Sequence, residues 1–240
     1  MNRSLAVLGM HRSGTSALMG TLRDAGVYLG EVFDNGFPLN PKGLQEPRSL
    51  IYMHEDLLNK NGGSWKNPPS AITWSDLHLA IRNLFIESRR SHSIWGFKEP
   101  RTLLVLDGWN EALPQLEYVG VFRHPFEVAL SLQKRNALNI DEGLELWNIY
   151  NLKLLNQYKA KPFPILEFHH NSNAVKKGLE YVCNILGLEF SPNGCGDTFF
   201  DSNMRTIKET PADDLPSNIQ DTYARLLSLS CNSRNRYNQA

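Results

Sequence analysis

The sequence has no excess of either charge, because 25 basic residues balance 25 acidic ones in a chain of 240. This balance removes the electrostatic basis for binding a nucleic acid or a membrane surface through overall charge. Cysteine is scarce, and Cys183, Cys195 and Cys231 lie far apart with no Cys-x-x-Cys pair. This spacing argues against a disulfide framework or a zinc site and fits a reducing compartment, so we expect a cytoplasmic protein.

Long apolar runs are also missing. No stretch reaches the roughly 20 residues that a membrane-spanning helix needs. A short apolar run near the N-terminus leads into Gly9 without a small-residue cleavage pattern, which argues against a signal peptide. A chain of this length most commonly forms one α/β domain. We therefore expect a single domain over residues 1–240, with a frayed polar end from about residue 232.

Short apolar segments alternate with helical patterns along the chain. Apolar runs predict strands at 5–8, 94–97, 118–122 and 164–168, with a further short strand at 27–29. Apolar periodicity and helix-start residues predict helices at about 15–25, 47–59, 76–88, 142–158 and 173–186, and helices that begin near 101 and 125. This alternation predicts a three-layer α/β fold, in which helices flank a central parallel sheet.

The segment from Gly9 to Gly14 joins the first strand to the first helix. Its glycines have the spacing of a phosphate-binding loop, where backbone N–H groups and a helix N-terminus face an anion. In loops that bind nucleoside triphosphates, a lysine follows the second glycine and the next hydroxyl holds Mg²⁺. Here Thr15 stands in place of the lysine, and the cation is Arg12 inside the loop. The alternative interpretation is a tight turn with a solvated arginine.

Cations end two of the predicted strands, Lys98 on one and Arg123 on the other. Ligands of open parallel sheets bind beyond the carboxyl ends of the strands, so Arg12, Lys98 and Arg123 should converge on one crevice. Such a crevice binds an anion and repels the divalent metal of phosphoryl transfer, which needs an acidic residue to position it. A sulfuryl group carries less charge than a terminal phosphoryl group, so cations and backbone donors can stabilise its transfer. The pattern favours a sulfonate donor over ATP and predicts no metal.

The segment after Arg123 contains a second possible anion site. If the strand ends at Arg123 and a helix begins at Pro125, Ser131 lies about two turns into that helix. A fixed phosphate would then accept a charged fork from Arg123 and a hydrogen bond from Ser131. Equally open is that Arg123 is a surface residue and Ser131 an ordinary helix residue.

Three blocks together resemble the signature of the P-loop-like sulfotransferase family, particularly its bacterial members. They are residues 9–18, the Lys-Glu-Pro-Arg run at 98–101, and Arg123-x-Pro125 followed by Ser131. The resemblance is specific from 9 to 131 and rests on the helix–strand–helix pattern beyond. It implies a P-loop NTPase-like sulfotransferase fold. It also implies transfer of a sulfuryl group from 3′-phosphoadenosine 5′-phosphosulfate (PAPS) to a hydroxyl or amine of a small-molecule or carbohydrate acceptor.

The resemblance also implies roles for individual residues. Lys98 would face the transferring sulfonate, and Lys98 and Arg12 would stabilise the charge that grows on the bridging oxygen. Arg101 would be a supporting cation or an acceptor contact. Arg123 and Ser131 would hold the ribose 3′-phosphate, and Arg205 is a further candidate cofactor contact. The first block would hold the 5′-phosphosulfate through His11, Arg12, Ser13, Gly14, Thr15 and Ser16.

The residue that takes the proton from the acceptor is expected to be a glutamate. Family members use a glutamate after the first helix or a histidine near the middle block, and the Lys98 block here has no histidine. Glu46, at the start of the second helix, is the first candidate. Glu31 is the second, and Glu99 is the third, although Glu99 can instead orient Lys98 and Arg101. For each of them the alternative is a solvated or helix-capping carboxylate.

Two other functions stay open at the level of sequence. A small-molecule kinase would use the same glycine loop, but Thr15 and the cationic strand ends disfavour it. A non-catalytic nucleotide-binding module would keep the anion site and lack the base. Acceptor specificity is expected to reside in the loops of residues 30–70, and the sequence names neither the acceptor nor the oligomeric state.

Overall fold

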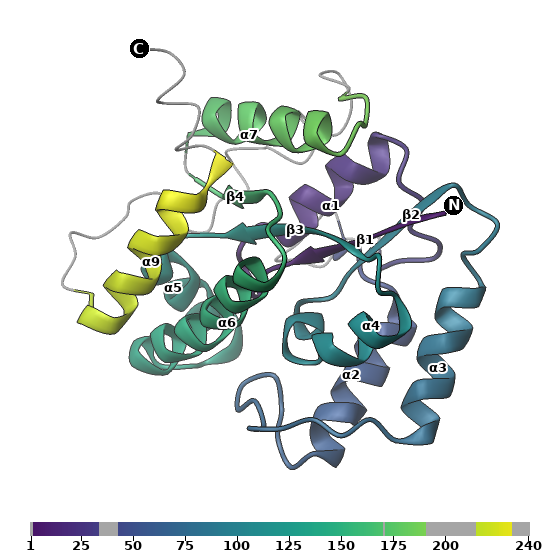
Figure 1. Cartoon of the computed structure of the whole chain (residues 1–240). Helices are drawn as coiled ribbons and strands as arrows, with labels where there is room; N and C mark the ends of the chain where they lie inside the picture. The colour runs from purple at the N-terminus through teal and green to yellow at the C-terminus, as the bar shows by residue number, and fades with distance from the viewer. Residues whose placement is uncertain (1, 34–42, 170, 191–214, 232–240) are drawn as a thin grey trace.

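The structure is a computed structural model that describes residues 2–33, 43–169, 171–190 and 215–231. A parallel sheet of four strands lies at its centre (Figure 1), in the order β2-β1-β3-β4. The strands are β1 (Arg3–Leu8), β2 (Ile94–Lys98), β3 (Glu117–Phe122) and β4 (Ile165–Glu167). The first strand in sequence therefore lies in the interior of the sheet, with β2 and β3 as its neighbours.

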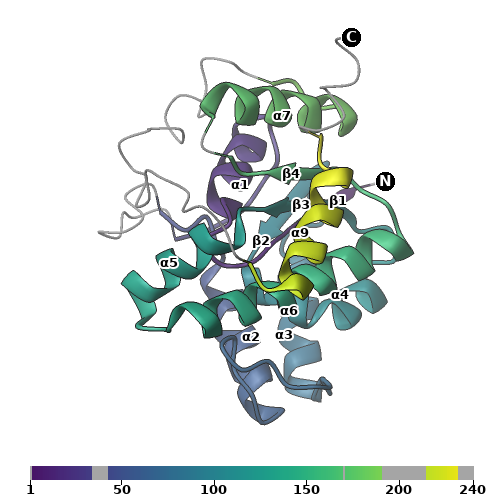
Figure 2. The ribbon, with the colours of Figure 1, turned by 90° about the vertical axis from the view of Figure 1, so that its left-hand side faces the viewer.

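Helices cover both faces of the sheet, as Figures 1 and 2 show from two directions. The helices α1 and α7 pack on one face, and α2 to α6 with α9 lie on the other. This arrangement is the predicted three-layer α/β fold. The helices are α1 (Thr15–Asp24), α2 (Arg48–Lys60), α3 (Asp76–Glu87), η1 (Pro100–Leu104, a 3₁₀ turn), α4 (Leu106–Ala112), α5 (Pro125–Asn136), α6 (Ile140–Ala160), α7 (Ser172–Ile185) and α9 (Ser217–Leu229).

Strand β1 is buried on both faces, which explains its unbroken apolar sequence. Leu5 and Val7 enter the hydrophobic cluster under α1 and α7, whereas Ala6 and Leu8 enter the cluster on the opposite face. Successive side chains of a strand point to opposite sides, so a strand covered by helices on both faces needs apolar residues at every position. The clusters fix β1, and with it the start of the glycine loop.

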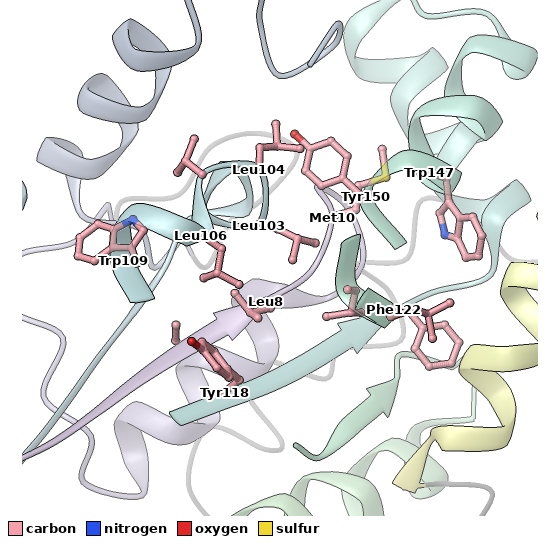
Figure 3. Close-up of a cluster of buried hydrophobic side chains, with 14 of the residues drawn as sticks. Leu8, Met10, Leu103, Leu104, Leu106, Trp109, Tyr118, Phe122, Trp147 and Tyr150 are labelled. Atoms are coloured by element: carbon pink, nitrogen blue, oxygen red, sulfur yellow. The ribbon is translucent and has the colours of Figure 1, made fainter. Parts of the chain in front are cut away.

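The larger cluster extends up to the glycine loop itself (Figure 3). Met10, the second residue of that loop, is fully buried in the cluster that also holds Leu8, Phe122 and Tyr150. Tyr150 comes from α6, and its hydroxyl donates a hydrogen bond to the carbonyl of Trp65, 3.2 Å away. The loop is thus attached to the core by an apolar side chain, while its polar residues stay available at the sheet edge.

The sequence-based assignment of elements is confirmed for the main strands and for most helices, within a few residues at each end. It is wrong at 27–29, where a single bridge between Tyr28 and Trp95 forms because the chain turns at Gly30, whose φ is 69°. The helix expected from residue 101 is a 3₁₀ turn followed by α4. Pro47 precedes α2 in extended conformation and is not part of its first turn.

Helix α9 was not predicted, although Ile219 and Leu226 on its buried face are seven residues apart, which is two helical turns. The predicted frayed end, 232–240, lies outside the described residues, and the single domain over 1–240 stays a prediction. None of the described helices combines the length and the apolar character needed to cross a bilayer.

Trp109 of α4 gives a test of the core. It is fully buried and packs edge-on against Trp74, Phe85 and His54. Replacing it with alanine should lower the free energy of unfolding by about 3–5 kcal/mol, because a large cavity would form. Urea denaturation measures this change. Leu84→Ala, on the exposed side of α3, should change it by no more than about 0.5 kcal/mol; similar losses in both variants would contradict this account of the core.

Candidate active site

The strand order places the glycine loop between two groups of cations. The loop leaves the carboxyl end of β1, Lys98 ends β2 on one side, and Arg123 follows β3 on the other. In the register of the sheet, Val7 lies opposite Lys98, and Leu8 lies opposite Gly120. Adjacent strands are about 4.8 Å apart, so all three segments end at the same edge of the sheet. The candidate site is therefore two-sided, with the loop between its flanks.

The glycine loop has a backbone that only special conformations allow. Arg12 has a φ of 68° and Gly14 a φ of 90°, both in the left-handed region. A Cβ at Gly14 would lie 2.3 Å from the ring of Phe168, and a Cβ at Gly9 would lie 2.4 Å from the carbonyl oxygen of Val121. These contacts require glycine at both positions.

Several hydrogen-bond donors of the loop are available to an anion. The N-cap residue of α1 is Gly14, so no N-cap side chain accepts a hydrogen bond from the first N–H groups of the helix. No acidic residue lies in the first turn of that helix either. The hydroxyl of Ser13 is buried, and within the described part of the chain it has no hydrogen-bond partner. Thr15, buried, begins the helix. A helix N-terminus and an unpartnered buried hydroxyl are both suited to bind a phosphate group. The donors present in the loop therefore fit the phosphate of the expected nucleotide.

Lys98 occupies the first flank and is fully buried, with 1% of its surface exposed. Its ammonium donates hydrogen bonds to Ser16 Oγ at 3.1 Å, to Glu46 Oε1 at 2.6 Å and to the carbonyl oxygen of Leu44. The hydroxyl of Ser16 in turn donates to the same carbonyl at 2.9 Å. A lysine ammonium has three donors. All three are used, so Lys98 ties α1 to the segment that precedes α2.

Glu46 is the candidate base that the structure brings to this flank. Burial, opposed by the charge of Lys98, raises the pKa of the Glu46 carboxyl. A raised pKa moves a carboxylate toward the range in which it acts as a general base. Glu31, the second candidate, is exposed in the described segment before residue 34.

The segment that carries Glu46 is held on both sides. Gln45 has a φ of 57°, and its side chain accepts a hydrogen bond from Arg23 Nη1 at 2.9 Å. The backbone N–H of Phe33 donates to the carbonyl of Glu46 at 2.9 Å. Pro47 then ends the extended run before α2. The position of Glu46 is thus set by contacts from α1 and from the chain before residue 34.

Glu99, the third candidate, is completely buried between two partners. It accepts a hydrogen bond from Arg101 Nη1 at 2.6 Å, and His54 Nδ1 lies 2.7 Å from its other oxygen. Trp109 Nε1 donates to His54 Nε2 at 3.0 Å, so the proton of His54 is on Nδ1 and points at Glu99. Burial alone would raise the pKa of Glu99, but the hydrogen bond from His54 and the charge of Arg101 outweigh it and lower the pKa to about 2. This environment favours the orienting role.

Arginines gather on the second flank. Arg12 Nε donates a hydrogen bond to Ser131 Oγ at 2.8 Å, and Arg123 pairs with Glu127 one turn along α5. Ser131 is buried in α5, which begins at Pro125 as predicted. Burial, followed by the charges of Arg135 and Arg123, lowers the pKa of Arg12 to about 10. Arg12 thus lies with the Ser131 group, and the three predicted cations occupy both flanks of the loop.

His11 lies against aromatic rings at the base of the loop. Its ring centroid is 4.5 Å from that of Trp65 and 6.1 Å from that of Tyr150. Burial, followed by the charge of Arg101, lowers the pKa of His11 to about 3, so its ring is neutral. Among the described residues, its Nε2 has no hydrogen-bond partner.

Sequence reasoning missed three groups that the structure adds. His54 orients Glu99. The charge of Arg135 contributes to lowering the pKa of Arg12. The buried Glu167 ends β4, and its carboxylate accepts a hydrogen bond from Tyr223 at 3.0 Å. The four-residue spacing from Ser131 to Arg135, which places both on one face of a helix, was the sequence signal that could have identified Arg135. Arg205 lies outside the described residues. Within them, no group of three or more His, Cys, Asp or Glu side chains is placed to hold a metal ion.

The fold and the loop define an α/β protein in which a loop bounded by two glycines joins the first strand to the first helix. Among solved structures, the chain is similar to the sulfotransferase domain of the olefin synthase from Synechococcus PCC 7002, with a TM-score of 0.58 and 18% identity over 93% of this chain and 94% of that one. A looser likeness, with a TM-score of 0.47 and 16% identity, links it to sulfotransferase STF1 from Mycobacterium tuberculosis H37Rv, over 95% of this chain and 77% of that one. No protein-family model and no curated protein matches. The likeness to the olefin synthase domain confirms the predicted sulfotransferase fold.

The buried Glu99 predicts a pH dependence of stability. Its pKa is lowered from the ordinary 4.5 to about 2, so its stabilising effect is complete above about pH 4.5 and is lost as the pH falls toward 2. Glu99→Gln should therefore lower stability at pH 7, because Arg101 loses the nearer of its two carboxylate partners, and should flatten the decline below pH 4.5. Urea denaturation from pH 7 to 3 measures both effects. The exposed Glu87→Gln in α3 is the control, and an equally steep decline in Glu99→Gln would contradict the assignment.

Proposed function

We propose that this protein is a sulfotransferase that moves a sulfuryl group from PAPS to a hydroxyl or amine of a small-molecule or carbohydrate acceptor, without a metal ion. The observation that carries the proposal is the hydrogen bond from the Lys98 ammonium to Ser16 Oγ, 3.1 Å long. Ser16 stands two residues after the second glycine of the loop. In loops that bind nucleoside triphosphates, the hydroxyl at this position holds Mg²⁺.

A protein cation therefore occupies the position at which a kinase loop places its metal. An ammonium group of the protein can stabilise charge on the anion that the loop binds, as the metal does in phosphoryl transfer. The lysine that a kinase carries after the second glycine is Thr15 here, and this side chain is buried. These features favour a sulfonate donor over the alternative of a small-molecule kinase.

The residues present provide a place for each charged part of PAPS. The loop from Gly9 to Gly14, the Ser13 hydroxyl and the start of α1 would hold the 5′-phosphate. Arg123 and Ser131 would hold the 3′-phosphate on the second flank, and Arg12 would bridge the two. When bound, the donor supplies the sulfuryl group and leaves as adenosine 3′,5′-bisphosphate. The sulfonate would face Lys98 on the first flank.

The hydrogen bonds of Lys98 suggest how the base becomes available. Because all three of its donors are used, Lys98 must release one partner to contact a sulfonate. If Lys98 moves away, the Leu44 carbonyl still accepts a hydrogen bond from Ser16. Glu46 instead loses the hydrogen bond that it accepts from the ammonium of Lys98. Releasing Glu46 leaves a buried carboxylate of raised pKa without its ammonium partner. Glu46 then accepts the proton of the attacking hydroxyl or amine, while Lys98 and Arg12 stabilise the negative charge on the departing phosphate oxygen.

Calorimetry tests the donor directly. The native chain should bind adenosine 3′,5′-bisphosphate more tightly than ATP with magnesium, because its cationic flanks fit a nucleotide with phosphates at both ribose ends. Arg123→Ala should weaken binding of the bisphosphate by about tenfold or more, since a charged hydrogen bond to a phosphate is lost. Tighter, magnesium-dependent binding of ATP would instead support a kinase. Binding of the bisphosphate without sulfuryl transfer to a broad acceptor panel would support a non-catalytic module.

Lys98→Ala separates catalysis from binding. Turnover with PAPS should fall on the order of 10² to 10³, as is common when one group that stabilises transition-state charge is removed. The affinity for adenosine 3′,5′-bisphosphate, which has no sulfonate, should change by less than about threefold. Steady-state kinetics and calorimetry give the two values. Lys60→Ala, exposed at the end of α2, is the matched control; equal losses of turnover and affinity in Lys98→Ala would rule out its role at the sulfonate.

A further inference from the structure

Two buried nitrogen atoms beside the first flank have no hydrogen-bond partner in the part of the chain that the structure describes. They are His11 Nε2, in the glycine loop, and Arg101 Nε, in η1. A buried polar atom without a partner is unfavourable, and nearly all such atoms in proteins are paired. The proposed function uses neither of these two atoms, so their pairing needs a separate explanation.

The two side chains are near each other. Burial lowers the pKa of His11 to about 3, and the charge of Arg101 is the strongest further cause. Both side chains are also near Tyr150 of α6. The ring centroids of His11 and Tyr150 are 6.1 Å apart. Burial and then the charge of Glu99 raise the pKa of Tyr150, and the charge of Arg101 opposes that rise. The two unpartnered nitrogens therefore belong to one group of side chains.

The group needs no charged ligand. Arg101 Nη1 donates a hydrogen bond to Glu99 at 2.6 Å, and Arg101 Nη2 lies 3.9 Å from a carboxylate oxygen of Glu55, so its charge is already balanced. His11 is neutral at physiological pH, because its pKa is about 3. An anion would meet the two carboxylates, and an ammonium has no lone pair to accept the Nε–H of Arg101. These partners favour a neutral polar group.

A hydroxyl is the neutral group that can pair with both nitrogens. The guanidinium Nε–H of Arg101 only donates, whereas His11 Nε2 donates or accepts according to the tautomer of the ring. A hydroxyl has one donor and two lone pairs. It can therefore accept from Arg101 and either donate to or accept from His11, while a carbonyl or ether oxygen fits only one tautomer.

We infer that the acceptor is a carbohydrate, in which a hydroxyl adjacent to the reacting one bridges Arg101 Nε and His11 Nε2. This inference rests on the proposed function, because it assigns the acceptor of the same site. Arg101 is bonded to Glu99, the residue that follows Lys98, so the bridging hydroxyl lies beside the position at which Lys98 would face the sulfonate.

The bridging hydroxyl is not the one that reacts. The reacting hydroxyl gives its proton to Glu46, and its oxygen bonds to sulfur as the bond from sulfur to the phosphate oxygen breaks. An acceptor with one hydroxyl can use Glu46 but leaves the two nitrogens unpaired. Sites that hydrogen-bond a substrate hydroxyl discriminate strongly against analogues that lack it.

Trp65 adds a surface that fits a sugar ring. Its ring is partly exposed, and its centroid lies 4.5 Å from that of His11. The hydrogen bond from Tyr150 to the Trp65 carbonyl fixes this segment against α6. Ligand sites commonly combine aromatic surface with a few placed polar groups. A sugar presents C–H groups on its faces and hydroxyls at its edge, which matches an indole ring beside two hydrogen-bonding nitrogens.

Two probes that differ by one hydroxyl, trans-1,2-cyclohexanediol and cyclohexanol, test this inference. Steady-state kinetics with PAPS as the donor give kcat/KM for sulfation of each probe. The native chain should favour the diol by about 10- to 100-fold, because cyclohexanol would bury two nitrogens without partners.

Two variants remove the nitrogens one at a time. His11→Phe keeps an aromatic ring and removes Nε2, and Arg101→Lys keeps a cation beside Glu99 and removes Nε. Each should reduce the preference for the diol to less than about threefold. His92→Phe is the matched control, because His92 precedes β2 at the edge of the sheet opposite the site, and it should keep the native preference.

The outcomes separate this inference from the function on which it rests. If the native chain shows no preference for the diol, or sulfates neither probe, the inference is wrong, and calorimetry with adenosine 3′,5′-bisphosphate shows whether the proposed donor is wrong too. If His11→Phe and Arg101→Lys both keep the preference, the nitrogens bind only water and the inference is wrong. Equal losses with both probes in these variants would show a general structural effect and would also overturn it. A preference that both substitutions abolish and His92→Phe keeps would support it.

Discussion

The site depends on the burial of one ammonium group. Lys98 ends a strand inside the protein, where a charge without hydrogen-bond partners would be strongly unfavourable. Three partners from two other segments, Ser16, Leu44 and Glu46, satisfy it. The same contacts that make its burial tolerable also join the first helix to the segment before α2. The need to satisfy Lys98 thus brings a candidate base, a hydroxyl from the first turn of α1 and a cation within one hydrogen-bonded group.

Strand order distributes the remaining charges. Because β1 has β2 on one side and β3 on the other, whatever follows these two strands must flank the loop that follows β1. One flank holds an ammonium with a carboxylate, and the other holds guanidinium groups with a hydroxyl. Under the proposed function, this division is the reason to expect a nucleotide with an anionic group at each end of its ribose and not a triphosphate, whose charges are adjacent.

The sequence allowed the sheet, the glycine loop and the helix at Pro125 to be predicted, because short continuous apolar runs, glycine spacing and proline position have local causes. The loop glycines are needed for a reason that their spacing does not show, since a side chain would overlap Phe168 or Val121. Contacts between distant segments were beyond such reasoning. Nothing in the local sequence shows that His54 and Glu99, 45 residues apart, would meet. The same holds for Arg12, which bonds Ser131 at a distance of 119 residues along the chain.

Met10 has a consequence for recognition. Its side chain is packed in the larger hydrophobic cluster although its backbone belongs to the loop. A flexible glycine-rich segment would have to be ordered by its ligand, and that loss of conformational entropy would weaken binding. Here the core orders the segment when the chain folds. A ligand of the loop would therefore meet a preorganised surface, and its binding would not be weakened by the cost of ordering that segment.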